Sequence, residues 1–215
     1  MTRLLGWLAA LGLAAGAIMG FAIAPREATQ GNVQRIMYLH VPAILVAYLA
    51  FGVVLVASVS YLWGRAAGAD RLAHASAEVG VVFTSINIAT GAIWGKPTWG
   101  TWWTWDARLT SVSIMFVIYL AYLLLRAMIE DGERAARFAA VLGIVAALDI
   151  PLVPFSVLWW RTLHQPPTLL GPGPTPMDPA FVLALIVNLV AFVLLYGYFT
   201  AKRVRLLRQE EEVFA

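Results

Sequence analysis

Six long apolar stretches constrain what this chain can fold into. Each approaches the roughly 20 residues that an α-helix needs to cross a bilayer. They cover residues 4–24, 41–63, 79–94, 109–125, 138–159 and 180–200. Only 13% of the 215 residues are charged, whereas soluble domains carry about 25%. The sequence therefore predicts an all-α integral membrane protein, with six transmembrane helices in a single domain over residues 1–215.

The distribution of lysine and arginine predicts the orientation of these spans. Ten of the 15 basic residues fall on one side of the spans and five on the other. Because the cytoplasmic side carries the excess, we expect both termini in the cytoplasm and the tryptophan-rich segment 94–111 outside. The first stretch is too long for the apolar part of a signal peptide, so we expect it to be retained. This basic edge favours contact with anionic membrane lipid, and nothing implies a nucleic-acid partner.

Two absences limit the possible chemistry. The chain contains no cysteine, which excludes disulfide and thiol chemistry within it. The loops between the stretches are short, so a catalytic ATPase would have to be another subunit. The third stretch carries Ser85, Asn87 and Thr90, and these polar groups must find partners inside the bundle.

Segment 94–111 contains five tryptophans within twelve residues, and Asp106-Ala107-Arg108 follows the last of them. If this segment is helical, Trp99, Trp102, Trp103 and Asp106 lie on one face, at i, i+3, i+4 and i+7. Such a face would form an aromatic platform for a planar, hydrophobic ligand. An ordinary interfacial tryptophan belt remains an alternative, and Asp106 is also well placed to cap the fourth span.

Two histidines are predicted on the same side as this segment. His40 lies at the end of the second span and His164 lies beyond the fifth, and two neutral imidazoles on opposite faces of a macrocycle would give six-coordinate haem. Each could instead cap a helix or bind a neighbour. Arg35 and Arg108 could pair with propionate carboxylates or extend toward lipid headgroups.

Two further ionisable residues are interpreted without a role in this site. His74 lies in a predicted cytoplasmic loop, where we expect it to be solvated. Asp149 interrupts the fifth span close to Pro151 and Pro154, and a carboxyl at such depth is expected to be neutral, paired or functional. The prolines predict a kink, and we expect Asp149 to stabilise it.

Three segments resemble a known family. Residues 99–110 (WGTWWTWDARLT) are similar to the tryptophan-rich WWD signature of the haem-handling proteins of cytochrome c biogenesis. Residues 35–42 (RIMYLHVP) and 156–166 (SVLWWRTLHQP) resemble the histidine segments of one branch, haem exporter protein C (CcmC). The larger relatives that attach haem to apocytochrome have extra spans and histidines, which this chain lacks.

The resemblance implies a multi-pass protein of the bacterial inner membrane that holds haem at the periplasmic face and passes it to the haem chaperone CcmE. Its implied partners are the CcmA and CcmB subunits of an ATP-binding-cassette pair and the small subunit CcmD. It implies b-type haem with His40 and His164 as axial ligands, and with Trp99, Trp102, Trp103 and Asp106 as the platform. Such a protein binds and transfers haem and is not a conventional enzyme.

Two other functions remain open from the residues. A b-haem electron-transfer subunit would usually take its histidines from within the spans, and here there is no second pair to carry electrons across the membrane. A permease subunit would need a polar path near the middle of the membrane, for which the sequence offers Asn87, Asp149 and Asn188.

Overall fold

The structure is built of α-helices, which confirms the all-α prediction. This computed structural model describes residues 2–164 and 177–214. Its α-helices are α1 (Thr2–Ala17), α2 (Met37–Gly64), α3 (Ala67–Trp99), α4 (Ala107–Met128), α5 (Gly132–Ala146), α6 (Asp149–Trp159) and α7 (Pro179–Phe214). A π-helix (Ile18–Ile23) continues α1, and a 3-10 helix (Val33–Ile36) leads into α2. Six segments are long and apolar enough to cross a membrane, with α5 and α6 together forming the fifth. The chain is therefore a multi-pass membrane protein.

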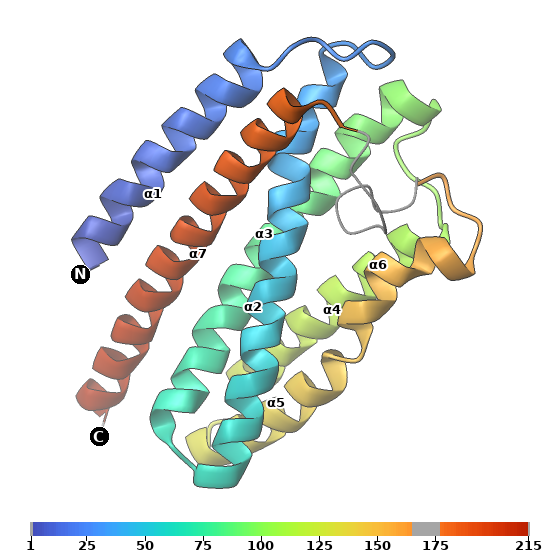
Figure 1. Ribbon diagram of the computed structural model, residues 1–215. Coiled ribbons are helices and arrows are strands. Elements are labelled where there is room, and N and C mark those ends of the chain that lie inside the picture. The colour runs from blue at the N-terminus through green and yellow to red at the C-terminus, as the bar shows by residue number, and fades with distance from the viewer. Residues whose placement is uncertain (1, 165–176, 215) are drawn as a thin grey trace.

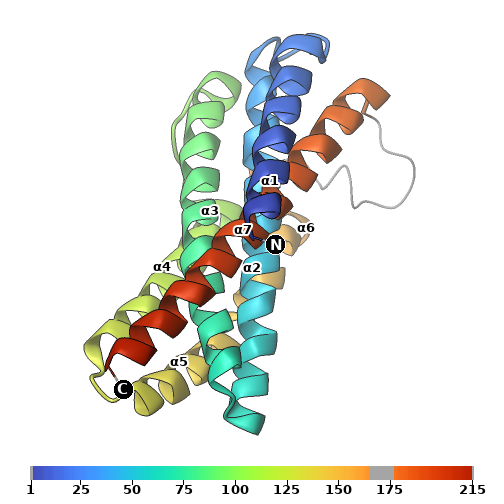
Figure 2. The same ribbon diagram turned by 90° about the vertical axis from the view of Figure 1, so that its left-hand side faces the viewer.

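Helix α2 lies at the centre of the bundle (Figure 1). It packs against α3, α5 and α7, while α4 packs against α3, α5 and α6. Helix α1 lies along α7 at one edge, as both views show (Figures 1 and 2). We call the end of the bundle that carries residues 100–106 the tryptophan end. Helix α1 runs toward this end and α7 runs away from it.

Small residues allow α2 and α3 to pack closely. Ala47 and Ala77 are fully buried, and a Cβ added to Gly80 would lie only 2.5 Å from the ring of Phe51. Between helices in lipid, such close packing supplies much of the attraction that the hydrophobic effect supplies in water. The Phe51 ring also stacks on Tyr119 of α4, with ring centroids 3.5 Å apart. This stack joins α4 to the central pair.

Two spans are longer than their apolar stretches predict. Helix α3 begins at Ala67, so the segment expected to be a loop after the second span is mostly helical, with only Arg65 and Ala66 between α2 and α3. Arg65 adopts a left-handed conformation (φ 52°), which ends α2 and turns the chain. Helix α7 continues through the charged tail to Phe214. Hydropathy does not detect these extensions because they carry charged residues.

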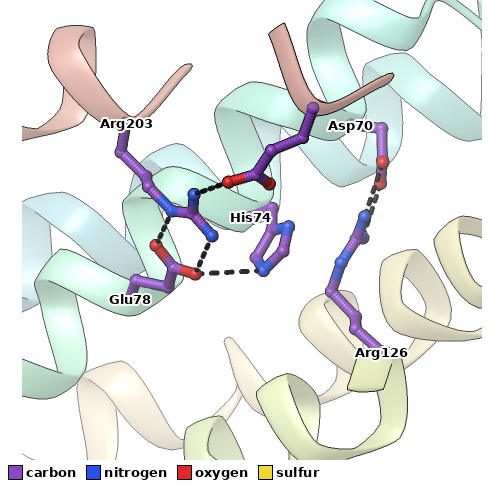
Figure 3. Close-up of polar contacts among 6 residues, drawn as sticks. Asp70, His74, Glu78, Arg126 and Arg203 are labelled. Atoms are coloured by element: carbon purple, nitrogen blue, oxygen red, sulfur yellow. Dashed lines mark hydrogen bonds and ion pairs between the residues drawn. The ribbon is translucent and has the colours of Figure 1, made fainter. Parts of the chain in front are cut away.

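Ion pairs join these extensions at the end of the bundle opposite the tryptophan end (Figure 3). Arg126 of α4 donates two hydrogen bonds of 2.6 Å to the carboxylate of Asp70 on α3. Arg203 of α7 donates two more to Glu78 of α3. His74 lies with Nε2 3.2 Å from the same carboxylate. The prediction that His74 is solvated was therefore wrong, because one helical turn places it beside Glu78.

The fifth span is broken, as its prolines predict, although the break precedes them. Helix α5 ends at Ala146 and α6 begins at Asp149. The backbone turns through i to i−3 hydrogen bonds, from Leu148 N–H to the Val145 carbonyl over 3.1 Å and from Ile150 N–H to the Ala147 carbonyl over 3.2 Å. Asp149 Oδ2 is buried and forms no hydrogen bond within the described residues. The expected role of Asp149 in stabilising the break is therefore not supported, because backbone contacts make the turn.

The contact between α1 and α7 gives a stability prediction. The Asn188 side-chain amide donates to the Gly16 carbonyl over 3.0 Å, and a Cβ on Gly16 would lie 2.5 Å from Asn188 Oδ1. We expect Gly16→Ala to separate the helices and to lower the free energy of unfolding by about 1–3 kcal/mol, as overpacking does. Thermal unfolding in detergent measures this.

The matched control is Gly52→Ala within α2. A Cβ at Gly52 would meet nothing within 4 Å, and alanine favours the helix by up to about 1 kcal/mol. We expect this variant to be at least as stable as the parent. Equal destabilisation of both variants would contradict the packing explanation.

Candidate functional site

Residues 100–106 of the tryptophan-rich segment are not helical. Helix α3 ends at Trp99, Gly100 adopts a left-handed conformation (φ 80°), and α4 begins only at Ala107. The condition under which Trp99, Trp102, Trp103 and Asp106 would share one helical face is therefore not met. Glycine permits the positive φ that ends α3, and Asp106 caps the next helix, so neither flank extends a helix through the segment.

His40 is held between α2 and α3. Its Nδ1 lies 3.0 Å from the Asn87 carbonyl oxygen and 3.2 Å from Thr90 Oγ1. Because that carbonyl only accepts, Nδ1 carries the proton and Nε2 has the lone pair. The Asn87 amide Nδ2 lies 3.2 Å from each ring nitrogen and donates to the His40 carbonyl over 3.1 Å. These contacts confirm that Asn87 and Thr90 have partners inside the bundle.

Four residues of α3 surround this imidazole with helical spacing. They are Asn87, Thr90, Gly91 and Trp94, at i, i+3, i+4 and i+7. A Cβ added to Gly91 would lie 2.9 Å from the His40 ring, and the Trp94 ring meets His40 edge-on with centroids 5.6 Å apart. The sequence interpretation did not assign this face to His40. In the sequence, the signal for this face was Asn87 and Thr90, two of the few polar residues in a mainly apolar span.

Asp106 connects the tryptophan segment to the segment that carries His164. Its Oδ1 accepts from Leu109 N–H over 2.8 Å, which confirms the cap of α4. Its Oδ2 accepts from Leu163 N–H over 3.2 Å and lies 3.4 Å from His164 Nδ1. The Trp99 ring lies against His164, with centroids 4.6 Å apart. Asp106 therefore both caps a helix and positions a histidine.

The environment of His164 favours its neutral form. Burial and then the Arg108 guanidinium lower the pKa of His164 below its ordinary value, and Asp106 opposes this only in part. The imidazole therefore keeps a lone pair at neutral pH, as a metal ligand requires. His40 lies within electrostatic range of both His164 and Arg108. Arg108 itself forms no hydrogen bond or ion pair with the described residues.

The other residues predicted for this site differ in their exposure and in their contacts. The Trp103 ring is partly buried and meets Trp105 edge-on at 5.5 Å, and its Nε1 has no partner in the described part of the chain. Trp102 is 57% exposed and Trp99 37% exposed. Arg35 donates to the Ala24 carbonyl over 3.3 Å, which fixes the connection before α2.

The structure thus brings His40, His164, Arg108, Asp106 and Trp99 to one end of the bundle. Trp94 and Trp99 each contact one of the two histidines. Within residues 2–164 and 177–214, no three His, Cys, Asp or Glu side chains gather as a metal site. Two imidazoles, a guanidinium without a partner among the described residues, and exposed indole rings are groups that suit a flat, anionic, metal-bearing ligand better than a bare ion.

Comparison with known proteins identifies the family of the chain. The family described as Heme exporter protein C (CcmC) matches residues 1–214. The chain is 43% identical to Heme exporter protein C of Bradyrhizobium diazoefficiens over 196 residues, 90% of this chain and 74% of that protein. It is 38% identical to Heme exporter protein C of Escherichia coli strain K12 over 193 residues, 90% and 78% of the two chains.

A mitochondrial protein is also similar to this chain. The chain is 36% identical over 177 residues to the putative cytochrome c biosynthesis ccmC-like mitochondrial protein of Marchantia polymorpha, with 82% of this chain and 75% of the relative covered. The family match extends over all the helices and includes both histidine segments and the tryptophan segment. The chain therefore belongs to the haem exporter protein C family.

Proposed function

We propose that this protein holds haem at the tryptophan end, on the periplasmic side of the bacterial inner membrane, and presents it to the haem chaperone CcmE. Family membership supports haem handling in cytochrome c maturation. The observation that supports the finer proposal is that His40 and His164, 124 positions apart in the sequence, lie within electrostatic range of each other and of Arg108. Haem is the cargo of this site and must be able to leave it.

The histidines supply the ligand atoms in this proposal. Each Nδ1 is turned toward the protein: that of His40 toward the Asn87 carbonyl and that of His164 toward the Asp106 carboxylate. Metal-binding histidines commonly use one nitrogen this way and offer the other to the metal. Binding through His40 Nε2 would displace the 3.2 Å contact with the Asn87 amide, which keeps its bond to the His40 carbonyl.

Arg108 and the indole rings would bind the rest of a b-type haem. Arg108 has no partner in the described chain and lies in electrostatic range of both histidines, so it suits a propionate carboxylate. Trp99 and Trp102 would cover part of the macrocycle, and burial of apolar area contributes about 25 cal/mol per Å². Exposed indole rings leave a haem edge accessible to a chaperone. We further propose CcmA, CcmB and CcmD as partners, with both termini cytoplasmic.

The first prediction tests axial ligation. We expect His40→Ala and His164→Ala each to convert six-coordinate haem to a lower-coordinate form, because each removes one ligand. Optical and resonance Raman spectra of the purified protein measure the change. His74→Ala is the control, since His74 lies near the start of α3, 25 residues before that helix ends at Trp99. Unchanged spectra and unchanged cytochrome c maturation in both site variants would refute the ligation.

A second prediction separates the two roles of Asp106, the positioning of His164 and the capping of α4. Asp106 and Asp131 each cap a helix, with bonds of 2.8 and 3.0 Å, but only Asp106 also contacts the His164 segment. Asp106→Ala and Asp131→Ala should each lose about 1 kcal/mol of stability. Only Asp106→Ala should weaken haem binding, roughly 10-fold to 100-fold, as loss of a residue that orients a ligand does. Equal haem affinities in the two variants, measured by titration, would exclude the positioning role.

A third prediction concerns Arg108. Loss of a charge-assisted hydrogen bond costs about 1.5–3 kcal/mol, so Arg108→Gln should weaken haem binding about 10-fold to 100-fold. Arg161→Gln is the matched control, because Arg161 is exposed just beyond α6. Haem dimethyl ester, whose propionates carry no charge, should bind the parent and Arg108→Gln equally. A persisting difference with the ester would show that Arg108 acts elsewhere.

A further inference from the structure

Several buried polar atoms between α2, α4 and the α5–α6 break have no hydrogen-bond partner in the described residues. They are Tyr48 Oη, Ser58 Oγ, Tyr119 Oη, Tyr122 Oη and Asp149 Oδ2. Tyr119, Tyr122 and Ser58 are fully buried, and Asp149 is 7% exposed. Each such group would cost at least a lost hydrogen bond if it stayed dry. None of them belongs to the proposed haem site.

The fold places Asp149 and Tyr119 at similar depth. Tyr119 lies 12 residues into α4 from its start at Ala107, and Asp149 lies 10 residues before the end of α6 at Trp159. Both ends lie toward the tryptophan end, and the two helices pack together. At 1.5 Å per residue, both side chains are about 15–18 Å from that end. Asp149 is also within electrostatic range of the Tyr119 hydroxyl.

Tyr48 joins these two groups from α2. It lies one turn before Phe51, whose ring stacks on Tyr119, so the two tyrosines face the same part of the core. The Tyr48 hydroxyl is within electrostatic range of Asp149 and of Arg108. Away from the tryptophan end, Tyr122 continues the series, with its ring centroid 6.4 Å from that of Tyr119.

The surroundings of Asp149 supply hydroxyl groups but no balancing charge. Helix α6 packs against α4 and α2. The titratable groups of these helices that lie within electrostatic range of Asp149 are Tyr119 from α4 and Tyr48 from α2. Within the described ranges, no ion pair joins Asp149 to a cation. A buried carboxylate without a counter-charge is strongly disfavoured, whereas a protonated carboxyl is neutral and can both donate and accept hydrogen bonds.

We propose that Asp149, Tyr48 and Tyr119 bind ordered water inside the membrane part of the bundle and form a proton-binding site with Asp149 as the protonated group. Water fills buried sites that offer it two to four polar partners, whereas apolar cavities stay dry. Here three side chains from three helices, each with a buried oxygen that has no partner among the described residues, provide them. The proton comes from water and returns to it, so no further reactant is needed. The site does not depend on haem binding.

Infrared difference spectroscopy of the full-length protein in lipid nanodiscs tests this. The spectrum of the parent minus Asp149→Asn at neutral pH should show the C=O stretch of a protonated carboxyl, and this band should shift when H₂O is replaced by D₂O. Should Asp149→Asn not fold, aspartate carrying ¹³C in its carboxyl group identifies the same band in the parent. Haem-free protein is sufficient, so failure here is distinct from failure of the haem proposal.

Tyrosine variants test the assignment of the hydroxyls. Tyr48→Phe and Tyr119→Phe keep the rings and should move the Asp149 band or slow its exchange in D₂O. Tyr61→Phe is the control, because Tyr61 lies 13 residues beyond Tyr48 on the same helix, about 20 Å away. A missing carboxyl band, or a band that does not respond to D₂O, would overturn the proposal. A band unmoved in both variants would overturn the assignment of Tyr48 and Tyr119.

Discussion

The hydrogen bonds between His40 and α3 are the interaction on which the site depends. Inside a membrane, a polar side chain without a partner is costly, so His40, Asn87 and Thr90 hold one another between α2 and α3. Gly91 leaves room for the ring. The position of Trp94 and the direction of α3 toward Gly100 follow from this contact, and they determine where the tryptophan segment begins.

The sequence predicts the spans well because hydropathy is averaged over some 20 residues. It also places His40 and His164 on the same side of the membrane, because an even number of spans lies between them in the sequence. It fails for segment 100–106, because helical periodicity assumes a continuous helix and Gly100 ends α3. It also misses the face formed by Asn87, Gly91 and Trp94, because pairing across helices depends on register, which one sequence does not show.

Asp106 explains why a loop rather than a helix carries the rings. A helix would fix every indole relative to the same axis, whereas an extended segment is fixed mainly at its two ends. Here the left-handed Gly100 fixes one end and the cap at Asp106 fixes the other. Because Asp106 also contacts Leu163 and lies near His164, the segment and the second histidine are positioned by the same carboxylate.

The length of α7 has a consequence for the opposite end. Its 36 residues give a helix about 54 Å long, which exceeds the hydrocarbon thickness of about 30 Å. The part beyond the lipid is joined to α3 by the partly exposed pair of Arg203 and Glu78. Contacts between exposed charges weaken as ionic strength rises, since the screening length is about 10 Å at 0.1 M salt. Ionic strength therefore weakens the contact of α7 with α3 while the aromatic and close-packed contacts near His40 stay unchanged.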